Sequence, residues 1–393
     1  MERTPARAVA PLLLAAMAIF VFTVTIGILN GTDLVDFGHG TILAHVHSGT
    51  LGWITLSIFA ATAWIFGAER LPRLLRDGSI VAVVAYVLAF WADLTDLRPF
   101  TGTLMLAAMV WFAVWTFGLR AGQALTVPKL SMLLSQVNLV IGGVLGVILG
   151  LMLSGVIDLS EGMQGAHPAM MVVGYLILAG VAIDEQLIGG PGTEELTRGG
   201  LWQAWLFFLA GIFLAIGILF EVMPLLGLNL LFEVIGVGIV FVRHRSRLAA
   251  VGWGTPSPAR FGAASILFLV PALVILGYVI VRYSDDIEAT PVRVLLALDH
   301  ATFIGILTNA IFGLLFIAAA SRREVWAWAD QVVFWAINLG VAGFVIGLLA
   351  DAAEIKRIAT PIMGAGILLG LLVVAMRLQA GMPETTRAVE PQR

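Results

Sequence analysis

Twelve apolar runs follow one another along this chain of 393 residues. Each is close to the roughly 20 residues that cross the hydrocarbon core of a bilayer as a helix. Helices are expected because a span must satisfy its own backbone polar groups, and these runs lack the period-two alternation of strands. The sequence therefore predicts an all-α integral membrane protein whose single domain covers residues 1–393. The runs lie at approximately 8–30, 41–68, 79–97, 101–119, 131–155, 167–188, 201–221, 223–242, 262–282, 295–319, 329–350 and 359–377.

The composition agrees with a membrane protein and excludes several kinds of chemistry. Hydrophobic residues make up 60% of the chain and charged residues only 12%, which is far from the composition of soluble domains. The absence of cysteine excludes disulfides, thiolate metal sites and iron–sulfur clusters. No basic tract suggests nucleic acid, so membrane lipid is the expected surrounding.

The positive charges predict how the twelve runs cross the membrane. With both termini in the cytoplasm, 17 of the 22 lysine and arginine residues fall in inner segments and 5 in outer ones. This distribution follows the positive-inside rule and predicts a multi-pass protein of a bacterial-type cytoplasmic (inner) membrane. The first run follows Arg3 and Arg7 and lacks a small-residue cleavage site, so we expect an uncleaved span. The five outer residues are Arg98, Arg282, Arg293, Lys356 and Arg357.

The six histidines are not scattered at random. His45 and His47, in the stretch AHVHSGTLGW, lie near the outer end of the second run, with His39 just before it. His167 and His300 lie at the outer ends of the sixth and tenth runs, whereas His244 belongs to an inner loop. Ionisable side chains within spans are rare and usually functional, and neutral imidazole is a common ligand of heme iron and copper. Four histidines at the same depth in the membrane therefore favour ligation of a cofactor over a purely structural hydrogen-bonding role.

Local spacing indicates an internal repeat of four helices. His45 and His167 each stand seven residues before a glycine that an aromatic residue follows, and His47 and His300 each stand five residues before a glycine. His45 is thus equivalent to His167, and His47 to His300. The predicted pseudo-repeats cover approximately 8–119, 131–242 and 262–377.

Helix geometry limits what the pair in AHVHSGTLGW can do. Two residues along an α-helix correspond to about 200° of rotation, so the side chains of His45 and His47 point to nearly opposite sides. The pair is poorly suited to hold one metal ion and well suited to ligate two cofactors on either side of the second run.

These residues resemble a known superfamily. HVHSGTLGW resembles the histidine-rich helix of the catalytic subunit of cbb3-type heme–copper oxidases, in which the two imidazoles ligate separate hemes, although that helix is the tenth of the subunit. The twelve-helix pseudo-threefold plan is also the fold of that superfamily. A second resemblance, carried by the early HxHxxxxG helix and by HATFIGILTNAIFG, is to NnrS-type membrane heme and copper proteins, which are linked to nitric oxide stress.

One departure changes what the resemblance implies. The copper site of a respiratory oxidase takes two of its three histidines from the seventh helix, and the seventh run here, LWQAWLFFLAGIFLAIGILFE, contains none. A complete oxygen-reducing heme–copper centre is therefore not expected.

The resemblance implies a membrane protein with one or two b-type hemes near the outer face. From the repeat, His47 and His300 are expected to be the two axial ligands of one low-spin heme, which leaves no open iron position. His45 and His167, together with His39, are expected to serve a second site for heme or copper. The implied role is electron transfer or handling of a diatomic gas such as NO or O₂, with a quinol or a c-type cytochrome as redox donor.

Two other functions stay open. Twelve spans are common among secondary transporters, whose membrane histidines bind substrate, metal or protons. A nitric oxide or quinol-linked reductase is the second alternative, and as an oxidoreductase it would need an open metal site.

A few further polar residues belong to the predicted site or its surroundings. Asp93, Asp96 and Arg98 lie in WADLTDLRPF, where the third run is predicted to end. They predict a structural salt bridge, a carboxylate that orients an imidazole, or an arginine that binds a heme propionate. Trp53 is expected to pack on a heme or at the interface. Asp184 and Glu185, at the inner end of the sixth run, are expected to be solvated.

Overall fold

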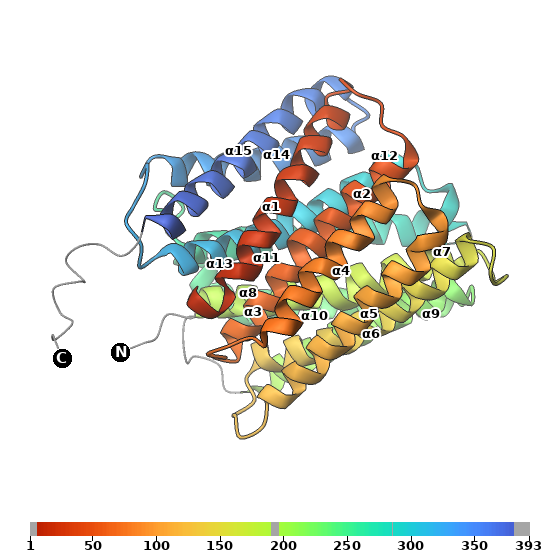
Figure 1. The fold of residues 1–393 in the computed structure, drawn as a ribbon, viewed down its shortest axis with the longest axis horizontal. Helices are drawn as coiled ribbons and strands as arrows, with labels where there is room; N and C mark the ends of the chain where they lie inside the picture. The colour runs from red at the N-terminus through yellow and green to blue at the C-terminus, as the bar shows by residue number, and fades with distance from the viewer. Residues whose placement is uncertain (1–5, 190–195, 285, 381–393) are drawn as a thin grey trace.

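The computed structural model describes residues 6–189, 196–284 and 286–380. Within them, twelve helices are long and apolar enough to cross a membrane, and the chain is a twelve-span membrane protein as the sequence predicts. Every element in these described ranges is helical (Figure 1). Some of the positive charges that oriented the chain, Arg3, Arg387 and Arg393, lie outside the described residues.

The first six spans are made of α-helices, two π-helical segments (η1 and η3) and one short 3-10 helix (η2), joined by short connections. They are α1 (Ala6–Gly31); α2 (His39–His47), η1 (Ser48–Thr55) and α3 (Leu56–Ile65); α4 (Arg73–Trp91); η2 (Thr95–Leu97) and α5 (Arg98–Leu119); α6 (Val127–Leu153); and α7 (Gly162–Ala169), η3 (Met170–Ile177) and α8 (Leu178–Gly189).

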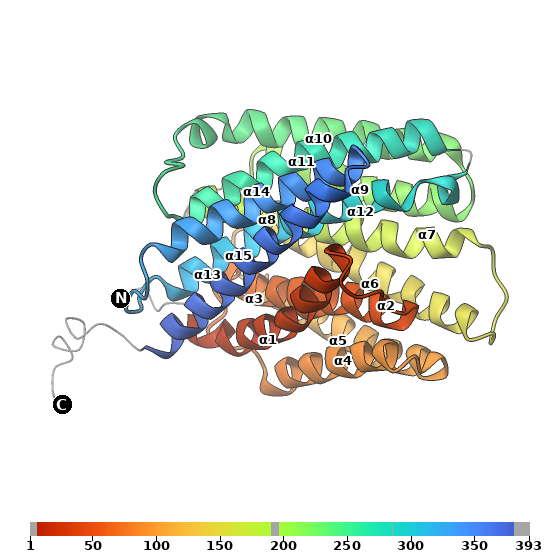
Figure 2. The ribbon, with the colours of Figure 1, turned by 90° about the horizontal axis from the view of Figure 1, so that it is seen from above.

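The last six spans follow the same plan. They are α9 (Arg198–Leu219); α10 (Met223–Ala249); α11 (Pro258–Tyr283); then, after η4 (Ile287–Ala289), α12 (Val292–His300), η5 (Ala301–Thr308) and α13 (Asn309–Ala319); α14 (Ala329–Leu349); and α15 (Ala353–Gln379). In Figure 2, α10 and α4 lie on opposite sides of the bundle.

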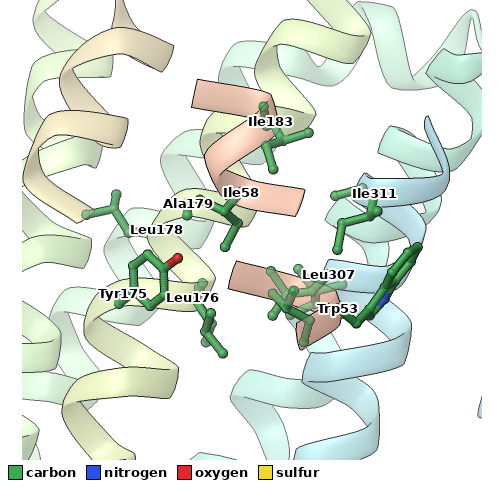
Figure 3. Close-up of a cluster of buried hydrophobic side chains, with 14 of the residues drawn as sticks. Trp53, Ile58, Tyr175, Leu176, Leu178, Ala179, Ile183, Leu307 and Ile311 are labelled. Carbon is green, nitrogen blue, oxygen red and sulfur yellow. The ribbon is translucent and has the colours of Figure 1, made fainter. Parts of the chain in front are cut away.

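The second, sixth and tenth spans form the centre of the bundle. In their most apolar stretches 83%, 78% and 78% of the residues are buried, whereas in each of the other nine spans the fraction is 56% or less. Trp53 and Ile58 from the second span, Tyr175 from the sixth and Leu307 from the tenth gather in one cluster (Figure 3). These three spans carry His45, His47, His167 and His300, and we call the end of the bundle where these residues lie the histidine end.

Each central span contains an eight-residue π-helical segment, and the three segments are in register. Gly52, Gly174 and Gly305 are the fifth residues of η1, η3 and η5. A Cβ on Gly52 would lie 2.3 Å from a side-chain carbon of Ile19 in α1, and one on Gly305 would lie 2.4 Å from Phe268 in α11. Glycine is required at these two positions because α1 and α11 pass this close. The three central spans thus agree with the repeat, while the division of the whole chain into three repeats stays a prediction.

The third span differs from its predicted bounds. It was expected at 79–97, but α4 ends at Trp91, and Asp93 has a positive φ of 53° in the connection. Arg98 begins α5 instead of ending the third span. The apolar pattern misplaced the end because Leu94 and Leu97 belong to the connection and to η2 and not to the helix.

The opposite end of the bundle, which we call the arginine end, holds buried polar residues that the sequence placed in solvent. Asp184 and Glu185 have no exposed surface, and His244 is 1% exposed. Glu185 Oε1 accepts hydrogen bonds from Arg243 Nη1 and Gln203 Nε2, both at 2.6 Å. The expectation of solvation was wrong because α10 continues past its apolar part to Ala249, carrying Arg243 and His244 against α8 and α9.

Candidate functional site

Two cavities at the histidine end each contain two histidines from different spans. His45 and His300 line the first cavity, between α1, the second and tenth spans, α14 and α15. His47 and His167 line the second cavity, between the second span, α4, α5, α6 and the sixth and tenth spans. All four side chains are half-buried. The two members of each pair are close enough to interact electrostatically.

This pairing corrects the one expected from the repeat. The sequence placed His47 with His300 and His45 with His167, but each cavity combines one histidine of each class. Equivalent residues in a cyclic repeat face equivalent directions, so they point into different cavities. Each cavity therefore takes its second histidine from another central span and from the other class, as His45 does with His300 and His47 does with His167.

The same rule explains why the bundle has two histidine cavities and not three. The register of the π-helical segments aligns His45 and His167 with Leu298, and it aligns His47 and His300 with Ala169. A third cavity would be formed by Leu298 and Ala169. Neither side chain can ligate a metal.

Hydrogen bonds divide the four histidines into the same two classes. The Nδ1 atoms of His45 and His167 each lie 2.9 Å from a main-chain carbonyl oxygen of the preceding helix, in Thr23 and Gly142 respectively. The Nδ1 atoms of His47 and His300 each lie 2.8 Å from the carbonyl oxygen four residues earlier in their own helix, in Leu43 and Leu296. The equivalences predicted from short spacings thus hold at the level of hydrogen bonding.

These bonds fix the tautomer of each neutral ring. A carbonyl oxygen can only accept, so Nδ1 carries the proton and donates it. The Nε2 lone pair is then free to bind a metal, and the Nδ1 bond holds the ring in place. Within the described residues the structure shows no hydrogen bond to any of these four Nε2 atoms.

Glycines make room for the rings that bond to the preceding helix. A Cβ on Gly27, four residues after Thr23, would lie 3.1 Å from His45 Cε1. A Cβ on Gly146, four residues after Gly142, would lie 2.7 Å from His167 Cε1. Sequence reasoning missed both glycines, although in α1 and in α6 the glycine stands four residues after the carbonyl that accepts the bond from the imidazole.

The first cavity is bounded by an ordered aromatic wall. Trp53 lines it, is fully buried, and stacks on Phe20 with ring centroids 4.3 Å apart. The indole Nε1 donates a 3.0 Å hydrogen bond to Thr308 Oγ1, which lies in the tenth span. Because two other groups fix its orientation, Trp53 presents a rigid flat surface to the cavity that also contains His45 and His300.

The second cavity has a different wall. The ring of His47 stacks on Phe90, with centroids 4.1 Å apart, and meets Tyr86 edge-on at 5.3 Å. Arg98 also lines this cavity and is 8% exposed. The residues shared by both cavities form the partition between them: Val46, Thr50, Asp299 and Phe303. Sequence reasoning did not identify this partition, because its members are far apart in the chain.

The remaining predicted site residues do not join the histidine pairs. His39 is exposed at the start of α2 and lines neither cavity, and Asp96 is exposed in η2. Asp93 bonds to Arg98 and not to an imidazole. The expected grouping of His39, His45 and His167 is not formed. Among the described residues, no three or more histidine, aspartate or glutamate side chains are grouped so that they could hold a metal ion.

The chain was also compared with models of protein families and with curated proteins. No family model and no curated protein matched it.

Proposed function

We propose that the protein is a membrane heme protein that holds two b-type hemes at the histidine end. His45 and His300 would be the axial ligands in the first cavity, and His47 and His167 those in the second. One observation carries the proposal: two cavities in the same bundle each place two imidazoles from different spans, with Nδ1 bonded to a carbonyl oxygen and Nε2 free.

The donor sets support heme better than a lone metal ion. Two neutral imidazoles are the axial ligand set of a six-coordinate heme iron, whereas a zinc site uses three or four protein ligands. The cavity walls are mostly apolar, with several aromatic side chains, and glycines line them, including Gly27 and Gly49 in the first and Gly143 and Gly146 in the second. Small residues allow a flat macrocycle to approach the helices closely.

The residues of the chain would bind and orient the cofactors. The carbonyl oxygens of Thr23, Gly142, Leu43 and Leu296 hold the four rings, and Trp53 and Phe90 close the sides. A heme supplies one-electron redox chemistry when bound. Because two histidines leave no open iron position, this arrangement favours electron transfer over binding of NO or O₂. The four residues that line both cavities would lie between the two cofactors.

The test is an absorption spectrum of the full chain, purified in detergent after heme-replete expression, in oxidised and dithionite-reduced forms. We expect a Soret band and, on reduction, the sharp bands of low-spin b-type heme, at a ratio of two hemes per chain. A protein without a Soret band would refute the proposal and leave the secondary transporter as the better interpretation.

A second measurement tests whether the irons are closed. Carbon monoxide added to the reduced protein should leave the spectrum unchanged if both irons have two histidine ligands. A carbon monoxide adduct would show an open position and would instead support gas handling or a reductase.

A further inference from the structure

The two cavities differ in one buried charge. Arg98, the first residue of α5, lines the second cavity with only 8% of its surface exposed. Its Nη2 donates a 2.5 Å hydrogen bond to Asp93 Oδ1, but its buried Nε has no hydrogen-bond partner. An arginine with an unused donor inside a cavity is equipped to bind an anionic group there.

Arg98 is closely linked to one of the histidines. Its guanidinium lies over the ring of Phe90, 4.7 Å from the centroid, and the same ring stacks on His47. Arg98 also interacts electrostatically with His47 and Tyr86. A charge at this position therefore acts on whatever His47 and His167 bind.

The first cavity has no equivalent cation. Within the described part of the chain, no lysine or arginine lines it, and its charged wall residue, Asp299, lies in the partition and faces both cavities. Lys356 and Arg357 lie nearby at the start of α15, but each donates a 2.8 Å hydrogen bond to Asp33. The carboxylate of Asp93, which partly balances Arg98, is 73% exposed and is therefore screened by water.

A buried positive charge favours the more negative state of a nearby group. Reduction of a ferric heme adds one negative charge, and the interaction is much stronger in a low-dielectric interior than in water. At an effective dielectric of about 20 and a separation of about 10 Å, two unit charges interact strongly enough to change an equilibrium about tenfold.

We propose that Arg98 binds a carboxylate of the heme in the second cavity and makes that heme the first of the two to be reduced. This inference rests on the proposed function and goes beyond it by assigning an order to the two sites. The electron that reduces the second-cavity iron comes from an added reductant such as dithionite, or from the ferrous heme of the first cavity, which becomes ferric.

The experiment is a spectroscopic redox titration of the full chain in detergent, compared with Arg98→Met, Arg98→Lys and Arg282→Gln. Arg282 is an exposed arginine at the end of α11 and serves as the control. The His300→Ala variant identifies the component that belongs to the second cavity, because it removes a ligand of the first.

We expect two components in the unaltered protein, with the second-cavity component reduced at the higher potential. Arg98→Met should lower the reduced-to-oxidised ratio of that component at a fixed potential by about tenfold, and the other component should shift less. Arg98→Lys should retain most of the difference, and Arg282→Gln should retain all of it.

Two results would overturn the inference while leaving the proposed function intact. One is that Arg98→Met and Arg98→Lys bind two hemes whose redox titration curves are the same as those of the unaltered protein. The other is a higher-potential component that disappears with His300→Ala. A chain without heme would instead refute the proposed function, and this inference with it.

Discussion

The Nδ1 atom of His45 lies 2.9 Å from the carbonyl oxygen of Thr23, on the helix that precedes it in the chain. His167 makes the same contact, of the same length, with Gly142. In both cases a glycine follows the bonded carbonyl by four residues and leaves space for the imidazole. The second and sixth spans therefore hold their histidine rings by the same kind of hydrogen bond.

The first prediction concerns which histidines act together. Alanine substitution of His45 or of His300 should remove the same spectral component, since both line the first cavity. Substitution of His47 or of His167 should remove the other component. The measurement is the reduced-minus-oxidised absorption spectrum of each single variant and of each double variant.

The double variants make this prediction decisive. The double variant His45→Ala, His300→Ala should still bind one heme through two histidines, because both substitutions affect the first cavity. The double variant His47→Ala, His300→Ala should bind no heme through two histidines, because each cavity then lacks one ligand. If His47→Ala and His300→Ala instead removed one shared component, the pairing by repeat equivalence would be right and the pairing by cavity would be refuted. His39→Ala is the matched control, because His39 is an exposed histidine outside both cavities.

The second prediction concerns the glycines that receive the rings. Gly146→Ala would place a methyl group 2.7 Å from His167 Cε1, closer than van der Waals contact allows. The ring must move, and we expect overpacking to reduce stability by about 1–3 kcal/mol. Gly27→Ala, at 3.1 Å from His45 Cε1, should cost less. Thermal unfolding in detergent measures both.

The control for these variants is Gly238→Ala in α10, where an added Cβ would meet no atom within 4 Å. It should be neutral or slightly stabilising, because alanine favours a helix more than glycine does. Equal effects of Gly146→Ala and Gly238→Ala would show that the space beside His167 is not needed.

Some of this fold was predictable from the sequence. The number of spans follows from the length of the apolar runs, because each span must cross the same thickness of hydrocarbon. The division of AHVHSGTLGW into two ligands that face apart follows from helix rotation alone. Both expectations needed only local sequence, and the structure has His45 and His47 in different cavities.

The partners of the histidines were not predictable in the same way. Whether His45 meets His167 or His300 depends on how the three central spans are arranged around their common axis, and no local pattern contains that information. Leu298 and Ala169 at the positions of the missing third pair were a usable signal. Because neither residue can ligate a metal, only two of the three equivalent positions can carry a histidine pair. The signal becomes readable only once the cavities have been located.

The third prediction concerns pH and an ion pair that joins the connection after α1 to the start of α15. Hydrogen bonds from Lys356 and Arg357, each 2.8 Å, hold the pKa of Asp33 below its ordinary value of 3.8. A lowered pKa in the folded state stabilises the protein above pH 3.8, and this contribution is lost as the pH falls through the folded-state pKa. The apparent melting temperature of Asp33→Asn should therefore be below that of the unaltered protein at pH 7, and the two should converge at low pH.

Salt provides a check on the cause. Asp33 and Arg357 are both exposed, so high ionic strength should screen their attraction and reduce the difference at pH 7. Asp36→Asn, which alters an exposed carboxylate in the same connection, should leave the melting temperature nearly unchanged. A difference between Asp33→Asn and the unaltered protein that persisted unchanged at low pH would show that the aspartate acts through something other than its charge.

The last prediction concerns the buried ion pair at the arginine end. Glu185 is fully buried, and its Oε1 lies 2.6 Å from Arg243 Nη1, with Gln203 bonded to both. Arg243→Met would leave the carboxylate inside the bundle without its main counter-charge, which costs about 3–5 kcal/mol in comparable buried pairs. The double variant Arg243→Met with Glu185→Met removes both charges, so it should recover a large part of this loss. The pair formed by the half-buried Arg76 and the exposed Asp77 in α4 is the control, and Arg76→Met should change the unfolding free energy by less than about 1 kcal/mol. If Arg243→Met had an effect as small as Arg76→Met, the network around Glu185 would not stabilise the contact between α8 and α10.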